Sequence, residues 1–211
     1  MSEYLDYGFE DASGSHSHRY LLDPLIKNLA GRENRTILDL GCGNGSLSGL
    51  LINKNLDVYG TDGSEKGIAI AKKKFPTRFA VQNLESDNLP AEFHGIPFNT
   101  VISTEVIEHL YHPLKLIRFA KKVLQTNGGG ELIISTPYHG YLKNLLISLS
   151  GKWDTHLRPD WDGGHIKMWS KTTLTRALER EGFCILNFKG CGRIPLLWKS
   201  MMIKASIGKS T

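Results

Sequence analysis

Thr36-Ile-Leu-Asp-Leu-Gly-Cys-Gly-Asn-Gly45 is the stretch of sequence that decides the fold. Its first five residues are apolar or β-branched apart from one acid, which predicts a buried parallel strand. The glycine-rich second half predicts a tight turn, and Ser46-Leu-Ser-Gly-Leu-Leu-Ile52 after it predicts a helix. A strand, a glycine turn and a helix in this order place bare backbone amides where a ligand can approach closely.

Asp39 indicates what kind of ligand this is. The residue stands at the carboxyl end of the expected strand, two positions before Gly41, where the pyrophosphate of a dinucleotide would otherwise lie. A carboxylate repels phosphate but attracts a ligand that carries an ammonium and a sulfonium group, as S-adenosylmethionine does. Ser46 also replaces the third glycine of the dinucleotide pattern G-x-G-x-x-G, which argues against a nicotinamide dehydrogenase.

A second acid follows at a suitable distance. Asp57-Val-Tyr-Gly-Thr-Asp62 predicts another strand, and Asp62 lies twenty-one residues after Gly41. An acid at the tip of the second strand can accept hydrogen bonds from both hydroxyls of a ribose. The two acids and the glycine turn together predict a site for a nucleoside linked to a cationic group.

The segments "ILDLGCGNG", "VYGTD" and "VISTEVIEHL" resemble the class I S-adenosylmethionine-dependent methyltransferases, over about residues 30–190. The resemblance implies a doubly wound, Rossmann-like sheet of seven strands, mostly parallel with an antiparallel last strand. Relatives commonly carry an acid where Asn83 stands, against the adenine amino group, and the backbone near the fourth strand's end meets the methionine part. The cofactor-binding residues implied are Asp39, Gly41, Cys42, Gly43, Asp62, Asn83 and Thr104.

The chain as a whole alternates strand-like and helix-like segments, which is the pattern of a doubly wound α/β sheet. We expect strands near 36–40, 57–61, 78–82, 99–103, 131–135, 183–188 and 197–204, and helices near 20–29, 46–54, 65–75 and 113–125 and from the cap Ser170 onward. A chain of 211 residues is long enough for one sizeable domain and short for two, so we expect a single domain over 1–211. Residues 1–18 lack periodicity and suit a flexible N-terminal arm.

Residues 137–169 interrupt the alternation after the fifth expected strand. Long insertions in compact domains are usually functional. Within this one, leucines recur at helical spacing and form one apolar face: Leu142, Leu145, Leu146 and Leu149. This face either packs onto the core or belongs to a lid over the acceptor pocket.

Composition and charge narrow the remaining possibilities. The start of the chain is polar and acidic, unlike a secretory signal, and no apolar run approaches the length of a membrane span. The three cysteines lack zinc-like spacing, so we expect reduced thiols and a cytoplasmic protein. The net charge of +5 is concentrated after Lys189, where it suits either an anionic partner or a solvated edge strand.

Glu105-Val-Ile-Glu108-His109 follows the fourth expected strand, where the methyl donor would meet its acceptor. Residues at i, i+3 and i+4 share one helical face, and two carboxylates with an imidazole suit Mg²⁺ or Mn²⁺. The ubiquinone-pathway O-methyltransferases carry similar E-x-x-E-H segments. Small-RNA 2′-O-methyltransferases do too, and add a histidine that Gly164-His165-Ile-Lys-Met-Trp169 resembles. The candidate metal ligands are Glu105, Glu108, His109 and His165.

The same four residues are candidate catalytic groups without a metal. Many methyltransferases of this fold carry E-H after the fourth strand and bind no metal, so His109 or His165 could act as a general base. Positioning of the acceptor could also suffice for a simple displacement. His139 is a spare candidate, or a loop residue with an exposed ring.

These observations predict an S-adenosylmethionine-dependent methyltransferase that methylates an oxygen of a small molecule, by resemblance to the ubiquinone-pathway group. The acceptor could be quinol-, metabolite- or glycan-like, and its identity and the oligomeric state are left open. One alternative is an RNA 2′-O-methyltransferase, although we do not expect nucleic acid as a partner because no separate RNA-binding module is visible. Another is a protein that binds adenosylmethionine without catalysis.

Overall fold

Seven strands form one sheet in the computed structural model, which describes residues 8–31, 35–84, 88–161 and 164–208. The strand order is β3-β2-β1-β4-β5-β7-β6. Strand β7 runs antiparallel to both of its neighbours, and the other pairs are parallel. The predicted doubly wound sheet with an antiparallel last strand is therefore confirmed. The strands are β1 (Thr36–Leu40), β2 (Asp57–Asp62), β3 (Phe79–Val81), β4 (Thr100–Thr104), β5 (Gly129–Pro137), β6 (Cys184–Cys191) and β7 (Ser200–Gly208).

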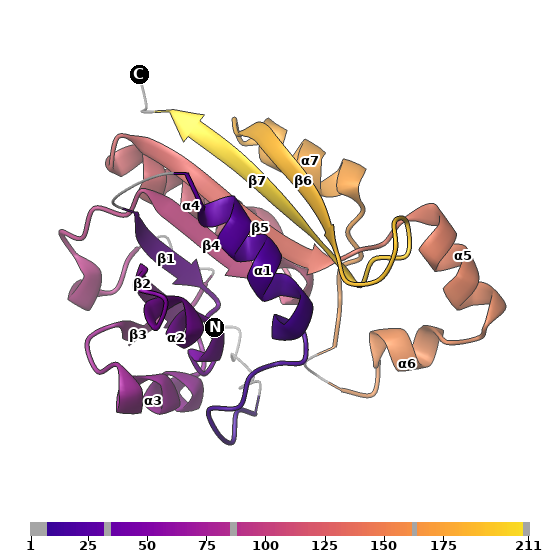
Figure 1. Ribbon diagram of the computed structural model, residues 1–211, viewed down its shortest axis with the longest axis horizontal. Coiled ribbons are helices and arrows are strands. Elements are labelled where there is room, and N and C mark those ends of the chain that lie inside the picture. Colours follow the sequence, from indigo (N-terminus) through magenta and orange to yellow (C-terminus); the bar gives the residue numbers. More distant parts are fainter. Residues whose placement is uncertain (1–7, 32–34, 85–87, 162–163, 209–211) are drawn as a thin grey trace.

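Helices cover both faces of the sheet because its strands are apolar on both sides. Ile37 of β1 packs with helices α1 and α2, whereas the next residue, Leu38, belongs to the cluster under α4 and α7. Figure 1 shows α1 in front of the sheet and α7 behind it. The helices are α1 (His18–Leu29), α2 (Ser46–Ile52), α3 (Glu65–Lys74), α4 (Pro113–Thr126), α5 (Tyr141–Leu149), α6 (Trp153–Leu157) and α7 (Lys171–Arg180), with short 3₁₀ turns η1 (Ala91–Phe93) and η2 (Ile107–His109).

Local signals explain where most elements begin. The Ser170 hydroxyl accepts a hydrogen bond from the Thr173 amide, so the predicted cap of α7 is confirmed. Strand β7 begins at Ser200, three residues after the predicted start at Leu197. The reason is Trp198, which lies in the turn before β7 and packs its ring edge-on against Tyr138 at 5.0 Å and against Phe188 of β6 at 5.7 Å between centroids. An apolar residue can thus fill a turn and imitate a strand.

Helices α5 and α6 extend away from the sheet beyond the end of β5 (Figure 1). The leucine face of α5 does not pack onto the core: its four leucines are between 39% and 76% exposed. That alternative of the sequence prediction is wrong. The buried side chain of α5 is instead Lys143, which is 7% exposed. The predicted role of residues 137–169 as a lid stays a prediction.

The described part of the predicted N-terminal arm contacts the glycine turn. The side-chain amide of Asn44 donates hydrogen bonds to the carbonyl oxygens of Asp11 and Ser13, at 2.8 and 2.9 Å. Residues 1–7 and Lys209 lie outside the described part of the chain, as do residues 162–163 of the insertion. Among the described residues, the structure has no helix with the length and apolar character needed to cross a bilayer.

Candidate active site

A cavity of about 1590 Å³ opens at the carboxyl ends of β1, β2 and β4. A single drug-sized ligand fills roughly 300–1,000 Å³, so this cavity has room for two small molecules side by side. We call the part around the glycine turn and the ends of β1 and β2 the β1–β2 half. The part bounded by η2, α5, α6 and the turn between β6 and β7 is the β4–α5 half.

The glycine turn of the β1–β2 half needs its glycines. Gly41 has φ of 83°, and a Cβ there would lie 2.4 Å from the Val106 side chain. Asp62 holds the turn in place through two hydrogen bonds. One carboxylate oxygen accepts from the backbone N–H of Gly43 at 2.9 Å, and the other accepts from the backbone N–H of Ser64 at 2.8 Å. Asp62 is therefore part of the architecture of the turn as well as a lining residue.

Asp39 is the most deeply buried acid of this half, with 1% exposure. Its Oδ2 accepts a hydrogen bond from the Ser48 hydroxyl. Its Oδ1 has no hydrogen-bond partner among the described residues. Burial raises the pKa of Asp39 to about 7. A buried carboxylate oxygen without a donor is costly, and a cationic ligand group in the cavity would satisfy it.

The other residues predicted to bind the cofactor line the same cavity. Cys42, Asn83 and Thr104 lie around it together with Asp39, Asp62 and the two glycines. Burial raises the pKa of the Cys42 thiol well above its ordinary value, so this cysteine is not a nucleophile. Sequence reasoning missed Phe9, whose ring a Cβ at Gly43 would meet at 2.6 Å. No motif marks Phe9 in the sequence.

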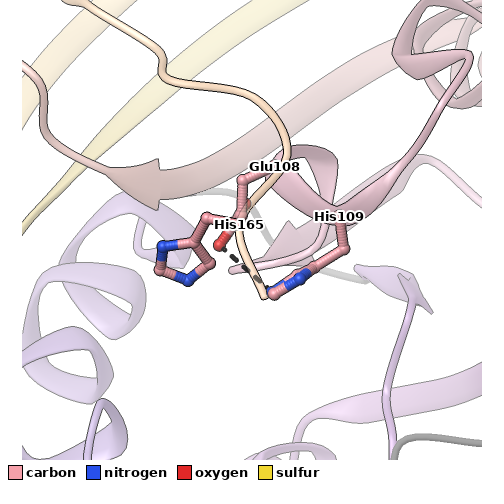
Figure 2. Close-up of side chains that lie close together, drawn as sticks. All are labelled: Glu108, His109 and His165. Carbon is pink, nitrogen blue, oxygen red and sulfur yellow. Dashed lines mark ion pairs between the residues drawn. The ribbon is translucent and has the colours of Figure 1, made fainter. Parts of the chain in front are cut away.

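Glu108, His109 and His165 meet in the β4–α5 half. Figure 2 shows the first two on the turn η2 and His165 on a neighbouring loop, with both rings beside the carboxylate. The carbonyl oxygen of Glu108 accepts hydrogen bonds from the amides of Ile166 and Lys167, which fixes that loop against η2. One possible ligand atom from each of the three side chains lies within 4.8 Å of the other two. The fold thus brings together His109 and His165, two predicted catalytic residues that lie far apart in the sequence.

The His109 ring has a defined orientation. Its Nδ1 lies 3.2 Å from the carbonyl oxygen of Gly164, and a carbonyl can only accept, so Nδ1 carries the proton. In the neutral ring, Nε2 is then the unprotonated nitrogen, and it lies 3.8 Å from Glu108 Oε1. Thr136 donates to the other Glu108 oxygen at 2.9 Å. Burial, and then the nearby Glu105, raise the pKa of Glu108 well above its ordinary value.

Glu105 does not belong to this group. The predicted helix over residues 105–109 is wrong: η2 is a short 3₁₀ turn, and Glu105 precedes it with φ of 56° in the left-handed region. Its two carboxylate oxygens accept hydrogen bonds from Ser135 and Ser200, each at 2.7 Å. Burial raises the pKa of Glu105 to about 7. These two hydrogen bonds occupy the Glu105 carboxylate, so it does not join the other three residues as a metal ligand.

Three further polar residues lie in this region, and of these the sequence predicted only His139, as a spare candidate. His139 is 5% exposed, so the expected exposed ring is wrong, and its centroid lies 5.1 Å from that of His156. Lys143 lines the cavity from α5. The one signal for this residue in the sequence is a single lysine in the apolar run Tyr141-Leu-Lys-Asn-Leu-Leu-Ile147.

The fold and the cavity define a class I S-adenosylmethionine-dependent methyltransferase. A sheet of order 3-2-1-4-5-7-6 carries an acid-flanked glycine turn at the carboxyl end of β1, as the sequence predicts for this class. The comparisons agree. A family model described as a methyltransferase domain matches residues 14–187, and the chain belongs to that family.

Named relatives fall in the same class. The chain is 30% identical over 193 residues to a ubiquinone biosynthesis O-methyltransferase of Hydrogenovibrio crunogenus, covering 89% of this chain and 79% of that one. A ubiquinone biosynthesis O-methyltransferase of Caulobacter vibrioides is 36% identical over 141 residues, and the match spans 61% of this chain and about half, 53%, of that protein.

A solved structure shares the fold. It is that of magnesium protoporphyrin IX methyltransferase from Synechocystis with bound S-adenosylhomocysteine. The superposition has a TM-score of 0.64 and 21% sequence identity, and it covers 90% of this chain and 82% of the other. The predicted enzyme class, with adenosylmethionine as methyl donor, is confirmed.

Proposed function

We propose that this protein transfers the methyl group of S-adenosylmethionine to a hydroxyl oxygen of a small molecule. The observation that carries the proposal is the group Glu108–His109–His165, which shares one cavity with the glycine turn. The names of the relatives, which are O-methyltransferases, support oxygen as the accepting atom. The large cavity supports donor and acceptor bound together.

The donor occupies the β1–β2 half. Asp39 Oδ1 accepts a hydrogen bond from the methionine ammonium. This contact gives the oxygen the partner that it lacks among the described residues. Asp62 accepts hydrogen bonds from the ribose hydroxyls at the carboxyl end of β2, because a carboxylate oxygen can accept more than one hydrogen bond. Asn83 meets the adenine amino group, and Thr104 lies near the methionine part.

The methyl group then moves in a direct displacement. The bond between the sulfonium sulfur and the methyl carbon breaks as the bond from the acceptor oxygen forms, and the hydroxyl proton must leave. His109 Nε2 takes that proton, because it is the unprotonated ring nitrogen in the tautomer that Gly164 imposes. The negative charge of an ionised Glu108, whose Oε1 lies 3.8 Å away, stabilises the resulting imidazolium.

The same three side chains also fit a small divalent ion. Glu108 Oε1 and His165 Nδ1 lack hydrogen-bond partners among the described residues, and ligation would satisfy both. Oxygen and imidazole ligands suit Mg²⁺ or Mn²⁺, and a bound ion would make an acceptor hydroxyl more acidic. Glu105 is left out of this set because Ser135 and Ser200 occupy its carboxylate.

One assay tests the proposal and separates the two mechanisms. Labelled adenosylmethionine is incubated with catechols, hydroquinones and hydroxylated sugars, before and after dialysis against a chelator. Methyl ethers should form, and a rate that falls on chelation and returns with Mg²⁺ or Mn²⁺ assigns the metal mechanism. An unchanged rate assigns His109 as a metal-free base. Donor binding with no transfer to any hydroxyl, including short RNA 3′ ends, would overturn the enzyme and favour a binding protein.

A further inference from the structure

The two halves of the cavity differ in charge, because the β4–α5 half combines Glu105 and Glu108 with lysines and an arginine. Acids line the β1–β2 half, as suits a cationic donor. Every lysine or arginine among the described residues that line the cavity comes from position 143 onward, on α5, the α5–α6 connection and the turn between β6 and β7. These four cations are Lys143, Lys152, Arg193 and Lys199. The donor's charge does not explain them, because they lie in the other half.

Lys143 is the cation that most needs a ligand. It is 7% exposed, and among the described residues its ammonium makes one hydrogen bond, to the Lys199 carbonyl at 3.1 Å, and no ion pair. An ammonium has three protons to donate, so two lack an acceptor. A buried charge without a counter-ion is costly. The Glu105 charge acts on Lys143 without a direct ion pair, because the two Glu105 carboxylate oxygens accept hydrogen bonds from Ser135 and Ser200.

Arg193 adds a second positive charge beside it. The residue sits in the turn between β6 and β7 with φ of 60°, a left-handed conformation that is unusual for arginine. Burial, and then the Arg193 charge, lower the pKa of Lys143 to about 8. Two like charges that face one cavity repel each other. A carboxylate or phosphate between them would remove the repulsion and supply the missing acceptors.

We propose that the methyl acceptor carries an anionic group, a carboxylate or phosphate, that Lys143 and Arg193 bind. The inference rests on the proposed function and names the substrate class of the same cavity. Bound in this way, the acceptor spans the β4–α5 half. Its anionic end lies at α5, and its hydroxyl points toward the group Glu108–His109–His165.

The other groups that face Lys143 set how the contact depends on pH. They are Arg193, Glu105 and the imidazoles of His139, His156 and His165. Burial lowers the pKa of His139 and of His165 to about 4, so both rings are neutral at pH 7. They therefore do not compete with Lys143 for an anionic ligand. As the pH rises through about 8, Lys143 loses its proton and anion binding should weaken.

The experiment compares ligands that differ only in charge. Binding of protocatechuate and of its neutral amide is measured by calorimetry with S-adenosylhomocysteine present, and inorganic phosphate and pyrophosphate serve as competitors. The acid should bind about tenfold more tightly than the amide, as expected for a charge-assisted contact. Competition by pyrophosphate and weak binding of the acid would indicate a phosphate-bearing acceptor. Equal binding of acid and amide without competition would overturn the proposal.

Variants place the contact. Lys143→Met and Arg193→Gln should each reduce the preference for the anion to about threefold or less, with donor affinity unchanged. Lys73→Met on α3 and Arg176→Gln on α7 are exposed controls that remove the same charges elsewhere. Arg193 is exposed, so Arg193→Gln should stay folded and still measure the anion preference if Lys143→Met lowers the melting temperature too far for a binding assay. A loss of donor affinity in both variants would overturn the proposal, since they would then bind the donor carboxylate.

The two proposals fail separately. If wild-type protein prefers anions and the variants lose this preference, the anionic subsite stands whether or not methyl transfer is found. If methyl transfer to neutral hydroxyl compounds is fast and unaffected by Lys143→Met and Arg193→Gln, the proposed function stands and the anionic subsite fails.

Discussion

The two halves of the cavity are built from the chain in different ways. The β1–β2 half takes its glycine turn and both of its buried acids from one short stretch, from Asp39 to Asp62. The β4–α5 half gathers side chains from η2, α5, the loop at His165 and the turn between β6 and β7. In our proposal the first half binds the methyl donor, which a whole enzyme class shares, and the second half binds the acceptor particular to this protein. A site assembled locally can be predicted from a motif, whereas a site assembled by the tertiary fold needs coordinates.

The sharpest test of this division is His109→Asn in the β4–α5 half. Loss of a general base or metal ligand should lower the rate of methyl transfer by about 10²–10⁴-fold, with donor affinity within about twofold of wild type. Rates come from label transfer and affinities from calorimetry. His112→Asn, which changes an exposed ring on the same loop, should leave both unchanged. A parallel fall of donor affinity in His109→Asn would mean that the two halves are not separate.

Asp39→Asn is the matching test of the β1–β2 half. The variant removes a charge-assisted contact to the methionine ammonium, so affinity for adenosylmethionine should fall about ten- to a hundredfold. Affinity for adenosine, which lacks the ammonium, should be unchanged. Asp23→Asn on the exposed face of α1 is the control. If adenosine binding weakened more than adenosylmethionine binding, Asp39 would belong to the nucleoside part of the site.

The pH dependence of donor binding sharpens the same assignment. Because burial raises the pKa of Asp39 to about 7, the carboxyl gains a proton as the pH falls through that value. A neutral carboxyl attracts the ammonium less, so affinity should decrease by up to about tenfold per pH unit below 7 and level off above it. Calorimetry from pH 5.5 to 8.5 measures this. A slope that persists in Asp39→Asn would assign the titration to another group.

Gly41→Ala should have the smallest effect and act on the fold of the turn. The new Cβ would lie 2.4 Å from Val106, and φ of 83° disfavours alanine by about 1–2 kcal/mol. The melting temperature should fall by a few degrees, roughly 2–8 °C for a domain of this size. Gly95→Ala is a useful control, because that glycine has a similar φ of 84° and no neighbour near a new Cβ. Equal melting shifts would show that backbone strain, and not contact with Val106, makes Gly41 necessary.

Much of the fold follows from the sequence because its signals are local. The apolar run Thr36–Leu40, the cap Ser170 and the alternation of strands and helices each act over a few residues, and each predicted the right element. The errors arose where a distant contact prevails over local preference. Trp198 belongs to a turn because Tyr138 holds it, and Glu105 leaves the expected helix because two serines from β5 and β7 bind its carboxylate.

The acceptor side of the cavity shows the same limit. His109 and His165 could be named from a resemblance, but their meeting depends on hydrogen bonds from Ile166 and Lys167 to the Glu108 carbonyl. Lys143 could not be foreseen, since a lysine among leucines on a helix ordinarily faces water. Here the leucines are exposed and the lysine is buried, because α5 extends from the sheet and turns its polar side to the cavity.

The place of β7 in the sheet bears on the order in which the protein matures during synthesis. This strand is the last of the described strands to leave the ribosome, yet it lies between β5 and β6, and its first residue, Ser200, anchors Glu105. The segments of the β1–β2 half are complete long before it appears, and amino-terminal parts of a chain fold first. A nascent chain should therefore acquire the shape that binds the methyl donor before the acceptor side closes.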